Sequence, residues 1–476
     1  MVDILIINGI LITMDPQRRV IERGAIAIQG GRIVDVGTTH ELTARHQALR
    51  IIDATHMAVM PGLIDGHAHA GHGLIKTMGG DRTEAWYQAC EKVYTTGSTE
   101  EFWYAEALLS ALERVKCGTT CGVSYLGGGD SVMRTNDPAY GDGHCEAVEQ
   151  AGIRSFLAVG PSRPPFPRYY SRWQGQSRID EKVTFERQLA TCETLIERWH
   201  KKGNQRINIC LSLPVHKPGI SGTDAPSDEV KAQSYAVREM SRKHGVCFTQ
   251  DGHMRGSIKV AHELNLLGPD AFLSHSIDLS EEEIGICRRT GTKIIHNPSA
   301  RMSITGRCPV PELLDAGVTV ALGSDGTAPD RSYDMFRHMF QCMHYHRTYY
   351  HDSNYLPPGK VLEMATIDGA RALDMDKEVG SLEIGKRADI ILVNMFKPHL
   401  YPLNMPVFRV VYFASGADVD TVIVDGKVLM ENRVVKTLNE GEVLEMAQRE
   451  TEAMLDRTQL RGLLETPDRF WGHSRY

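Results

Sequence analysis

Short apolar runs alternate with amphipathic stretches through the middle of the chain, from about residue 62 to residue 370. Eight of these runs have the composition of buried strands, and helical patterns such as 101–115 and 228–244 lie between them. Eight strands that alternate with helices over about 300 residues are typical of a (β/α)8 TIM-like barrel. The predicted strands are 63–65, 119–124, 154–159, 207–213, 246–250, 271–274, 293–295 and 318–322.

An open doubly wound sheet is the alternative α/β architecture for this pattern. We favour the barrel because polar residues follow the carboxyl ends of many different predicted strands. Catalytic groups of a barrel collect at that end, whereas an open sheet collects them at one crevice.

Both ends of the chain have a different pattern, with short apolar or alternating runs and glycine-containing turns. Runs at 4–13, 25–28 and 33–36 resemble those at 388–393 and 419–424. Neither flank is long enough to complete a sheet, so we expect the two to pair into a small β-sandwich. The predicted divisions are 1–60 and 376–437 for the two halves of the sandwich, 61–375 for the barrel, and 438–476 for a C-terminal helix and tail.

Composition and charge narrow the functional class. Hydrophobic residues make up 42% and charged residues 24% of 476, which is ordinary for a globular protein. With 53 Lys and Arg against 60 Asp and Glu, the net charge of −7 offers no basis for nucleic-acid binding. No run reaches the roughly 18 apolar residues of a membrane span. The N-terminus reads as a strand rather than a signal peptide, and ten cysteines lack CxxC spacing, so we expect a cytoplasmic protein with reduced thiols.

The strongest chemical signal is the sequence from Pro61 to His69, PGLIDGHAH. Side chains alternate along a strand, so His67 and His69 point the same way. Two imidazoles at one strand end can bind a divalent transition-metal ion. The alternative is a pair of surface histidines, but the apolar run before them indicates a buried strand.

Three further predicted strands end in residues that can serve the same site. Asp325 follows 318–322, His275 follows 271–274, and His296 with Asn297 follows 293–295. A carboxylate such as Asp325 can bind a metal and accept a proton from water. Each of these residues alone is more typical of a structural role. Four strand ends of this kind in one predicted barrel favour an active site.

The ordered set of motifs resembles the amidohydrolase superfamily. The similarity covers nearly the whole chain and includes 61–69, the strands that end before His275 and Asp325, and the segments 361–373 and 380–389. Within the superfamily, the chain is similar to the branch that holds atrazine chlorohydrolase and other s-triazine hydrolases, aminopurine deaminases, and phenylurea and thiocarbamate hydrolases.

The resemblance implies roles for individual residues. His67 and His69 would bind one divalent metal per chain; we expect zinc, with iron, cobalt or nickel as alternatives. Asp325 would be a further ligand and the general base. His275 would stabilise the oxyanion or transfer a proton, or would bind a second metal in a binuclear site.

The fifth predicted strand departs from the family pattern of His-x-x-Glu. His253 is our expected ligand there, but Gly256 stands three residues later where the family has a glutamate. If the strand is aligned without a gap, Asp251 takes the ligand position instead. Both have the same parity along the chain, so both can face the pocket.

The absent glutamate bears on the substrate, because attack on a heteroaromatic ring needs an acid beside a ring nitrogen. A urea, carbamate or amide has a carbonyl oxygen that the metal itself can polarise. We therefore expect hydrolysis of a non-peptide C–N bond in such a small molecule. The alternative is an aminohydrolase or chlorohydrolase of an aminated s-triazine, purine or pyrimidine, with Asp251 or Glu84 as the acid. A third, non-enzymatic alternative is a metal-free barrel that serves as a scaffold.

Several other residues are candidates for contact with the substrate or with the ligands. Lys217 follows the fourth predicted strand, where binuclear relatives carry a bridging lysine; the alternative is a solvated loop lysine. The remaining candidates are Gln250, His296, Asn297, Tyr125 and Trp86. We expect a small-molecule substrate, no nucleic-acid or membrane partner, and a homo-oligomer.

Overall fold

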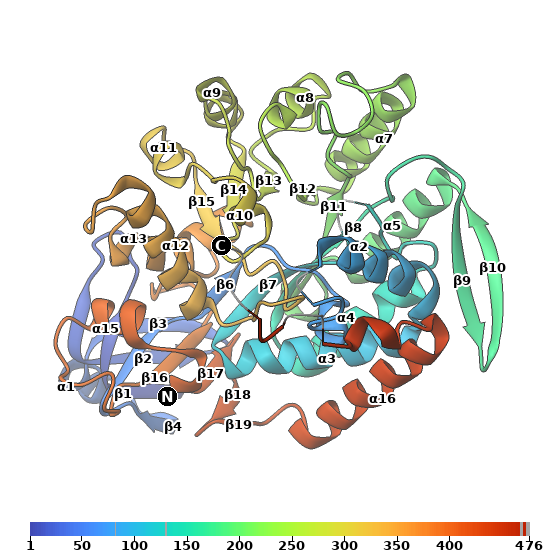
Figure 1. Cartoon of the computed structure of the whole chain (residues 1–476). Helices are drawn as coiled ribbons and strands as arrows, with labels where there is room; N and C mark the ends of the chain where they lie inside the picture. The colour runs from blue at the N-terminus through green and yellow to red at the C-terminus, as the bar shows by residue number, and fades with distance from the viewer. Residues whose placement is uncertain (81, 129–130, 467–469, 473–476) are drawn as a thin grey trace.

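A computed structural model describes residues 1–80, 82–128, 131–466 and 470–472. Its centre is an eight-stranded parallel sheet in the order β15-β14-β13-β12-β11-β8-β7-β6 (Figure 1). Helices surround this sheet, and the (β/α)8 prediction is confirmed. The strands are β6 (Leu63–Asp65), β7 (Thr119–Tyr125), β8 (Arg154–Val159), β11 (Ile207–Ser212), β12 (Phe248–Gln250), β13 (Ala271–Ser274), β14 (Lys293–His296) and β15 (Val320–Leu322).

The first and last strands of the barrel meet through loop contacts rather than a regular ladder. The amide of Gly66 donates to the carbonyl of Leu322 at 2.8 Å. Just beyond this bond, Asp65 accepts from both the backbone amide and the hydroxyl of Ser324, each at 2.8 Å. Arg114 from α3 pairs with the same carboxylate at 3.1 Å, and all three side chains are buried. This network closes the barrel beside the segment that carries Asp325.

Strands from the two chain ends pair with one another, as the sequence predicts, and they form one nine-stranded sheet. β5 joins the two ends, because it pairs with β1 on one side and with β16 on the other. Apolar residues from both ends, such as Ile26 and Leu392, pack together on this sheet. Its strands are β1 (Val2–Ile12), β2 (Val20–Gln29), β3 (Arg32–Thr38), β4 (Ala48–Asp53), β5 (Met57–Pro61), β16 (Ile390–Asn394), β17 (Val419–Val424), β18 (Lys427–Glu431) and β19 (Val434–Val435).

The helices cover the outside of the barrel and one end of the sheet (Figure 1). The α-helices are α1 (Thr39–Arg45), α2 (Thr83–Lys92), α3 (Glu100–Lys116), α4 (Ala139–Ala151), α5 (Phe185–Trp199), α6 (Lys202–Gln205), α7 (Asp228–His244), α8 (Ser257–Glu263), α9 (Glu281–Thr290), α10 (Met302–Thr305), α11 (Val310–Asp315), α12 (Met335–Tyr350), α13 (Pro358–Met364), α14 (Ile367–Ala372), α15 (Pro406–Phe413) and α16 (Glu440–Thr458). Shorter helical turns are η1 (His72–Ile75), η2 (Val93–Gly97), η3 (Gly416–Asp418) and η4 (Arg461–Leu464). α16 is the helix expected near the C-terminus, and it packs on α3.

One hairpin was not predicted. After the proline-rich loop at 162–167, β9 (Arg168–Gln174) and β10 (Ser177–Val183) form an antiparallel pair that projects from the barrel (Figure 1). Charged residues dominate β10 and most of it is exposed, so no apolar alternation marks it as a strand.

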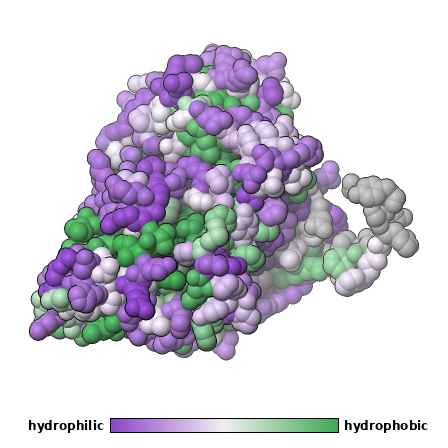
Figure 2. Space-filling model, turned by 90° about the vertical axis from the view of Figure 1, so that its left-hand side faces the viewer, coloured by the Kyte–Doolittle hydropathy of each residue, from purple (hydrophilic) through white to green (hydrophobic). Residues whose placement is uncertain are grey.

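Exposed apolar side chains gather on the face that carries α15. They include Phe396, Met405, Phe408 and Phe413, each at least 40% exposed. Figure 2 shows apolar surface in a band across this side of the molecule. The homo-oligomer stays a prediction. Among the described residues, no helix combines the length and apolar character that crossing a bilayer requires.

Candidate metal centre and active site

Five side chains from four barrel strands converge at the carboxyl end of the barrel. Nε2 of His67 lies 3.3 Å from Oδ1 of Asp251 and 3.4 Å from Oδ1 of Asp325. Nε2 of His69 lies 3.4 Å from Asp251 and 3.2 Å from Asp325. Nε2 of His275 lies 3.0 Å and 3.6 Å from the same two carboxylates. The site therefore alternates imidazoles with carboxylates around one centre.

The backbone holds two of these residues in an unusual conformation. His275 has φ 63° and Asp325 has φ 61°, in the left-handed region that non-glycine residues rarely adopt. Neighbouring strands maintain both, since the amide of His275 donates to Ile295 at 3.1 Å and that of Asp325 to His67 at 2.8 Å. Such strain is typical of functional sites, where the surrounding structure stabilises it.

The charges of neighbouring side chains decide which of these aspartates and histidines are ionised. Burial opposes ionisation of Asp251 and Asp325, but the pKa of each is held well below its usual value, by His67 at Asp251 and by Arg331 and His275 at Asp325. Burial also lowers the pKa of His275, yet the two carboxylates outweigh it and raise that pKa to about 9. The aspartates are therefore ionised at neutral pH, as ligands must be.

The donor set fits a divalent cation. One ligand atom each from His67, Asp251, His275 and Asp325 lies within 4.8 Å of the others, and all four residues are buried. Both ring nitrogens of His67 lack a hydrogen-bond partner although the side chain is fully buried. Imidazole nitrogen and carboxylate oxygen together suit zinc and related transition metals. A cation would give the orphaned nitrogen its partner and offset two buried negative charges.

The geometry corrects our preference on the fifth barrel strand. Asp251, and not His253, points into the ligand group. His253 instead bonds through Nδ1 to Ser257 at 2.9 Å, and burial lowers its pKa to about 3. The strand ends at Gln250, so Asp251 is the first residue beyond it. Alignment without a gap, the alternative in the sequence analysis, matches this geometry.

Arg331 is a neighbour of the site that sequence reasoning missed. Its Nη2 lies 3.3 Å from Oδ2 of Asp325, and its side chain is 4% exposed. The same guanidinium donates to the carbonyl of Ala328. This buried positive charge offsets the negative charge of Asp325, the candidate general base. Its place six residues after Asp325 gave no periodic signal, because the segment is a loop.

A cavity of about 230 Å³ opens onto the two carboxylates and His275. Trp86 and Lys217, two of the candidates from the sequence, line it together with Arg301 and Arg331. Among its described lining residues, Asp251 and Asp325 are the only carboxylates. Gly256 is the N-cap of α8, and Met254 stands three residues after Asp251, so neither position supplies an acid.

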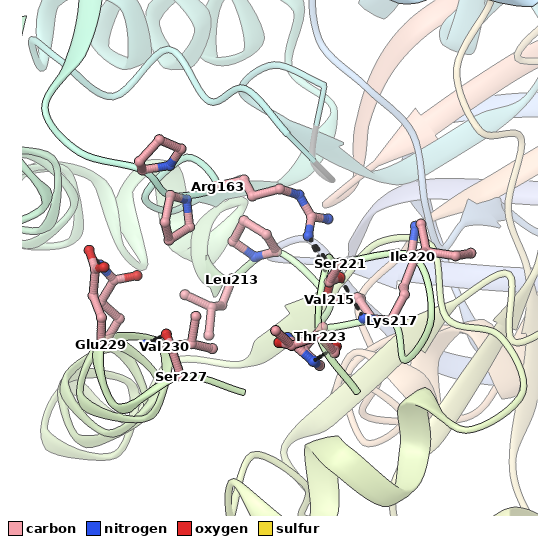
Figure 3. A pocket seen from close by; sticks show the side chains of 15 residues that line it. Arg163, Leu213, Val215, Lys217, Ile220, Ser221, Thr223, Ser227, Glu229 and Val230 are labelled. Atoms are coloured by element: carbon pink, nitrogen blue, oxygen red, sulfur yellow. Dashed lines mark hydrogen bonds between the residues drawn. The ribbon is translucent and has the colours of Figure 1, made fainter. Parts of the chain in front are cut away.

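A second, larger cavity of about 580 Å³ adjoins the first through Lys217, which lines both. Figure 3 shows it between the loop at Arg163, the loop that carries Val215 and Ser221, and the start of α7. Arg163 donates to the carbonyl of Val215 at 3.1 Å and ties the two loops together. The proline-rich loop therefore borders this outer cavity through Arg163, Pro164 and Pro165.

The other residues nominated from the sequence do not line the cavity of about 230 Å³. Tyr125 is buried beneath His67, with ring centroids 5.0 Å apart, and its hydroxyl bonds to Thr249. Gln250 donates to the carbonyl of Leu213 at 3.2 Å. Asn297 is fully buried. His296 faces away from the site, towards α12 and His346. Glu84 is exposed on α2 and does not line the cavity.

Sequence comparison places these features in a known group. Residues 228–429 match the amidohydrolase family, and residues 24–46 match the imidazolonepropionase-like composite domain of bacteria. The chain is 32% identical over 453 residues to the 5-methylthioadenosine/S-adenosylhomocysteine deaminase of Syntrophobacter fumaroxidans, covering 93% of this chain and 96% of that protein. It is 31% identical to the 5'-deoxyadenosine deaminase of Methanosarcina mazei, covering 96% and 99%.

Solved structures share the fold at lower identity. An adenosine deaminase from Xanthomonas campestris with bound zinc has a TM-score of 0.81 at 21% identity, covering 96% of this chain and 99% of that one. Atrazine chlorohydrolase from Arthrobacter aurescens TC1, complexed with zinc, has a TM-score of 0.77 at 21% identity, covering 94% and 100%. With relatives above 30% identity along almost the entire length, the chain belongs to the amidohydrolase family and is a hydrolase that acts on C–N bonds.

Proposed function

We propose that this enzyme removes an exocyclic amino group from a heteroaromatic ring by hydrolysis, and that its substrate is a 6-aminopurine nucleoside altered at the 5' position. The observation that carries the proposal is the match to deaminases of such compounds across more than nine-tenths of both chains. The comparisons thus favour the alternative of the sequence analysis over a urea or carbamate. The absent glutamate was weak evidence, because a proton donor can come from another strand.

We further propose His67, His69, Asp251 and Asp325 as the ligands of one zinc ion in this centre. The bound cation would lower the pKa of a water molecule from about 15.7 towards 7. Asp325 would take the proton of that water, and the oxygen would attack the amino-bearing ring carbon. His275, 3.0 Å from Asp251, would orient the attacking oxygen. Asp325 would then pass its proton to the amine, which leaves as ammonia. The new hydroxyl would lose its proton as the ring carbonyl forms, and that proton replaces the one given to the ring nitrogen.

The ring nitrogen beside the attacked carbon also needs a proton. Neither acid suggested from the sequence suits this role, because Asp251 lies in the ligand group and Glu84 lies outside the cavity. Lys217 lines the cavity along with Asp251 and Gly252, and its side chain ends in a group that can donate a proton. We assign the proton transfer to Lys217.

The outer cavity supplies a place for the rest of the substrate. At about 580 Å³ it is larger than the cavity at the metal centre, and Lys217 marks the junction of the two. Pro164, Pro165 and Leu213 give it apolar walls. A purine in the inner cavity would direct its 5' substituent outward into this space.

A substrate panel tests the proposal. Zinc-reconstituted protein is assayed for ammonia release from 5'-deoxyadenosine, 5'-methylthioadenosine, adenosine and an aminotriazine, and for hydrolysis of a phenylurea and a carbamate. We expect kcat/KM for the best 5'-modified nucleoside to exceed that for any urea or carbamate by at least about 100-fold, or about 2.7 kcal/mol of barrier. Hydrolysis of a urea with no ammonia from any ring would overturn it.

The assignment of Lys217 has its own control. Lys217→Met should lower kcat strongly on the ring substrate, whereas Lys231→Met, on the exposed surface of α7, should leave it unchanged. An unchanged kcat in Lys217→Met would remove the lysine from the proposal and leave deamination itself standing. The cytoplasmic location and the homo-oligomer stay predictions.

A further inference from the structure

A second cluster of ligating side chains lies outside the active site, between the barrel and α12. It consists of His296 at the end of β14 and of Cys342 and His346 on α12, and we call it the outer cluster. One ligand atom from each residue lies within 4.8 Å of the other two. All three side chains are fully buried.

The alternation of side chains along β14 explains why His296 faces α12. Ile295 points into the barrel, where it lies 3.0 Å from the position that a side chain on Gly66 would occupy. β14 and β6 are not neighbours in the sheet, so this contact crosses the barrel interior. His296 therefore points to the outer side. Cys342 and His346 are four residues apart on one helix and share its inward face.

The cluster has polar atoms without partners. Neither ring nitrogen of His296 has a hydrogen-bond partner in the structure, and neither does either ring nitrogen of His346. The two rings lie 5.4 Å apart, close enough to share a ligand but without a bond between them. Buried polar groups in folded proteins nearly always have partners. Four orphaned nitrogens beside one thiol therefore point to a ligand.

The side chains have the protonation that a metal ion requires of histidine. Burial and the neighbouring His346 hold the pKa of His296 well below its usual value, and burial lowers the pKa of His346 to about 4. Both imidazoles are thus neutral and keep a lone pair. No carboxylate belongs to the cluster among the described residues, and the charges of Arg307 and Glu312 act on His346 in opposite directions.

We propose that the outer cluster binds a second transition-metal ion, zinc, through His296, Cys342 and His346, separate from the ion of the active site. Thiolate sulfur and imidazole nitrogen are both ligand types that zinc takes in proteins. Binding replaces the thiol proton of Cys342, which leaves to solvent, and forms one Zn–S and two Zn–N bonds without any change of oxidation state.

The position of the cluster gives the ion a structural role. α12 begins at Met335, directly after the loop that carries Asp325 and Arg331. β14 lies between β13, which precedes His275, and β15, which precedes Asp325 (Figure 1). An ion that links α12 to β14 would therefore help to hold the loop between β15 and α12, which carries Asp325 and Arg331.

Metal content tests the proposal. The full chain is purified, stripped with a chelator, reloaded with zinc, freed of excess ion and analysed by elemental mass spectrometry. We expect two ions per chain in the wild type and one in Cys342→Ser and in His346→Gln. Cys192→Ser is the matched control, because Cys192 is also a fully buried cysteine on a helix, and it should keep two.

Cobalt substitution separates the two sites without relying on a variant. Cobalt bound to a thiolate gives a sulfur-to-metal charge-transfer band, and the ligand group of the active site contains no sulfur among the described residues. The wild type should show this band in proportion to the second equivalent, and Cys342→Ser should lack it. A single ion per chain with no band in the wild type would overturn the proposal, as would a band and second ion that persist in Cys342→Ser. Neither result depends on the identity of the substrate.

Discussion

The active centre and the outer cluster lie at the same end of the barrel, on the inner and outer sides of its wall. The pKa of a histidine shifts in opposite directions at these two places. His275 sits against two carboxylates, and its pKa rises to about 9. His346 lies beside a thiol and another imidazole, and burial lowers its pKa to about 4. Both side chains are buried, so burial alone does not decide protonation; the charge of the nearest partners does.

The comparison also separates two kinds of metal binding. The active centre contains two carboxylates beside Arg331 and the imidazoles, and a cavity opens onto it. The outer cluster is neutral until its thiol loses a proton, and it is closed to solvent. An open, charged site suits catalysis, and a closed, thiolate-containing site suits a structural role.

The largest expected effect is at Asp325, the proposed general base. Asp325→Asn keeps an oxygen near the metal but cannot accept a proton, so kcat should fall by at least about 10²-fold. Steady-state rates on the best nucleoside, with metal content measured in parallel, check this. Near-normal turnover in a variant that retains its metal would show that another group activates the water.

The next largest effect concerns which residue after β12, Asp251 or His253, binds the metal of the active centre. Asp251→Ala should lose the active-centre metal, because it removes a carboxylate within 3.4 Å of His67 and His69. His253→Ala should retain that metal, since His253 lies outside the ligand group and bonds to Ser257. Elemental analysis after dialysis distinguishes them. The reverse outcome would restore His253 as the ligand.

Charge compensation by Arg331 should have a smaller effect. Arg331→Met removes the cation 3.3 Å from Asp325, so that carboxyl loses the ion pair that orients it, and its pKa rises. We expect kcat on the best nucleoside to drop about tenfold in steady-state assays, equivalent to about 1.4 kcal/mol of barrier. Arg331→Lys should recover part of the loss. Arg301→Met serves as the control, because Arg301 lines the same cavity but pairs with Thr83.

The smallest effects concern stability and pH in chelated protein. His346 has a folded pKa of about 4, below its unfolded value of about 6.5, so its contribution is present above pH 6.5 and is lost as pH falls towards 4. His275 has a folded pKa of about 9, so its contribution is present below pH 6.5 and is lost as pH rises through 9.

Urea unfolding across pH 4.5 to 9.5 checks both signs. His346→Gln should flatten the acid side of the profile and His275→Gln the alkaline side, each by up to about 1.4 kcal/mol per pH unit. If both variants changed the same side, the contrast between the two clusters would be wrong.

Several features could be predicted because they depend on local pattern. Three predicted elements match the structure residue for residue: 154–159 is β8, 271–274 is β13 and 228–244 is α7. They could be predicted because an apolar run and its capping residues are neighbours in the sequence. His67, His69, His275 and Asp325 could be nominated because strand ends of a barrel share one face. The pairing of the chain ends followed from their composition.

Other features depended on contacts between distant segments, and only the tertiary structure decided them. Parity left Asp251 and His253 equivalent, and the turn after β12 directs one into the ligand group and the other to Ser257. Arg331 reaches Asp325 through a loop without periodicity, and His296 meets His346 across fifty residues of sequence. A sequence records which side chains are available along each element; the packing of elements fixes which of them face one another, and with that their charge and chemistry.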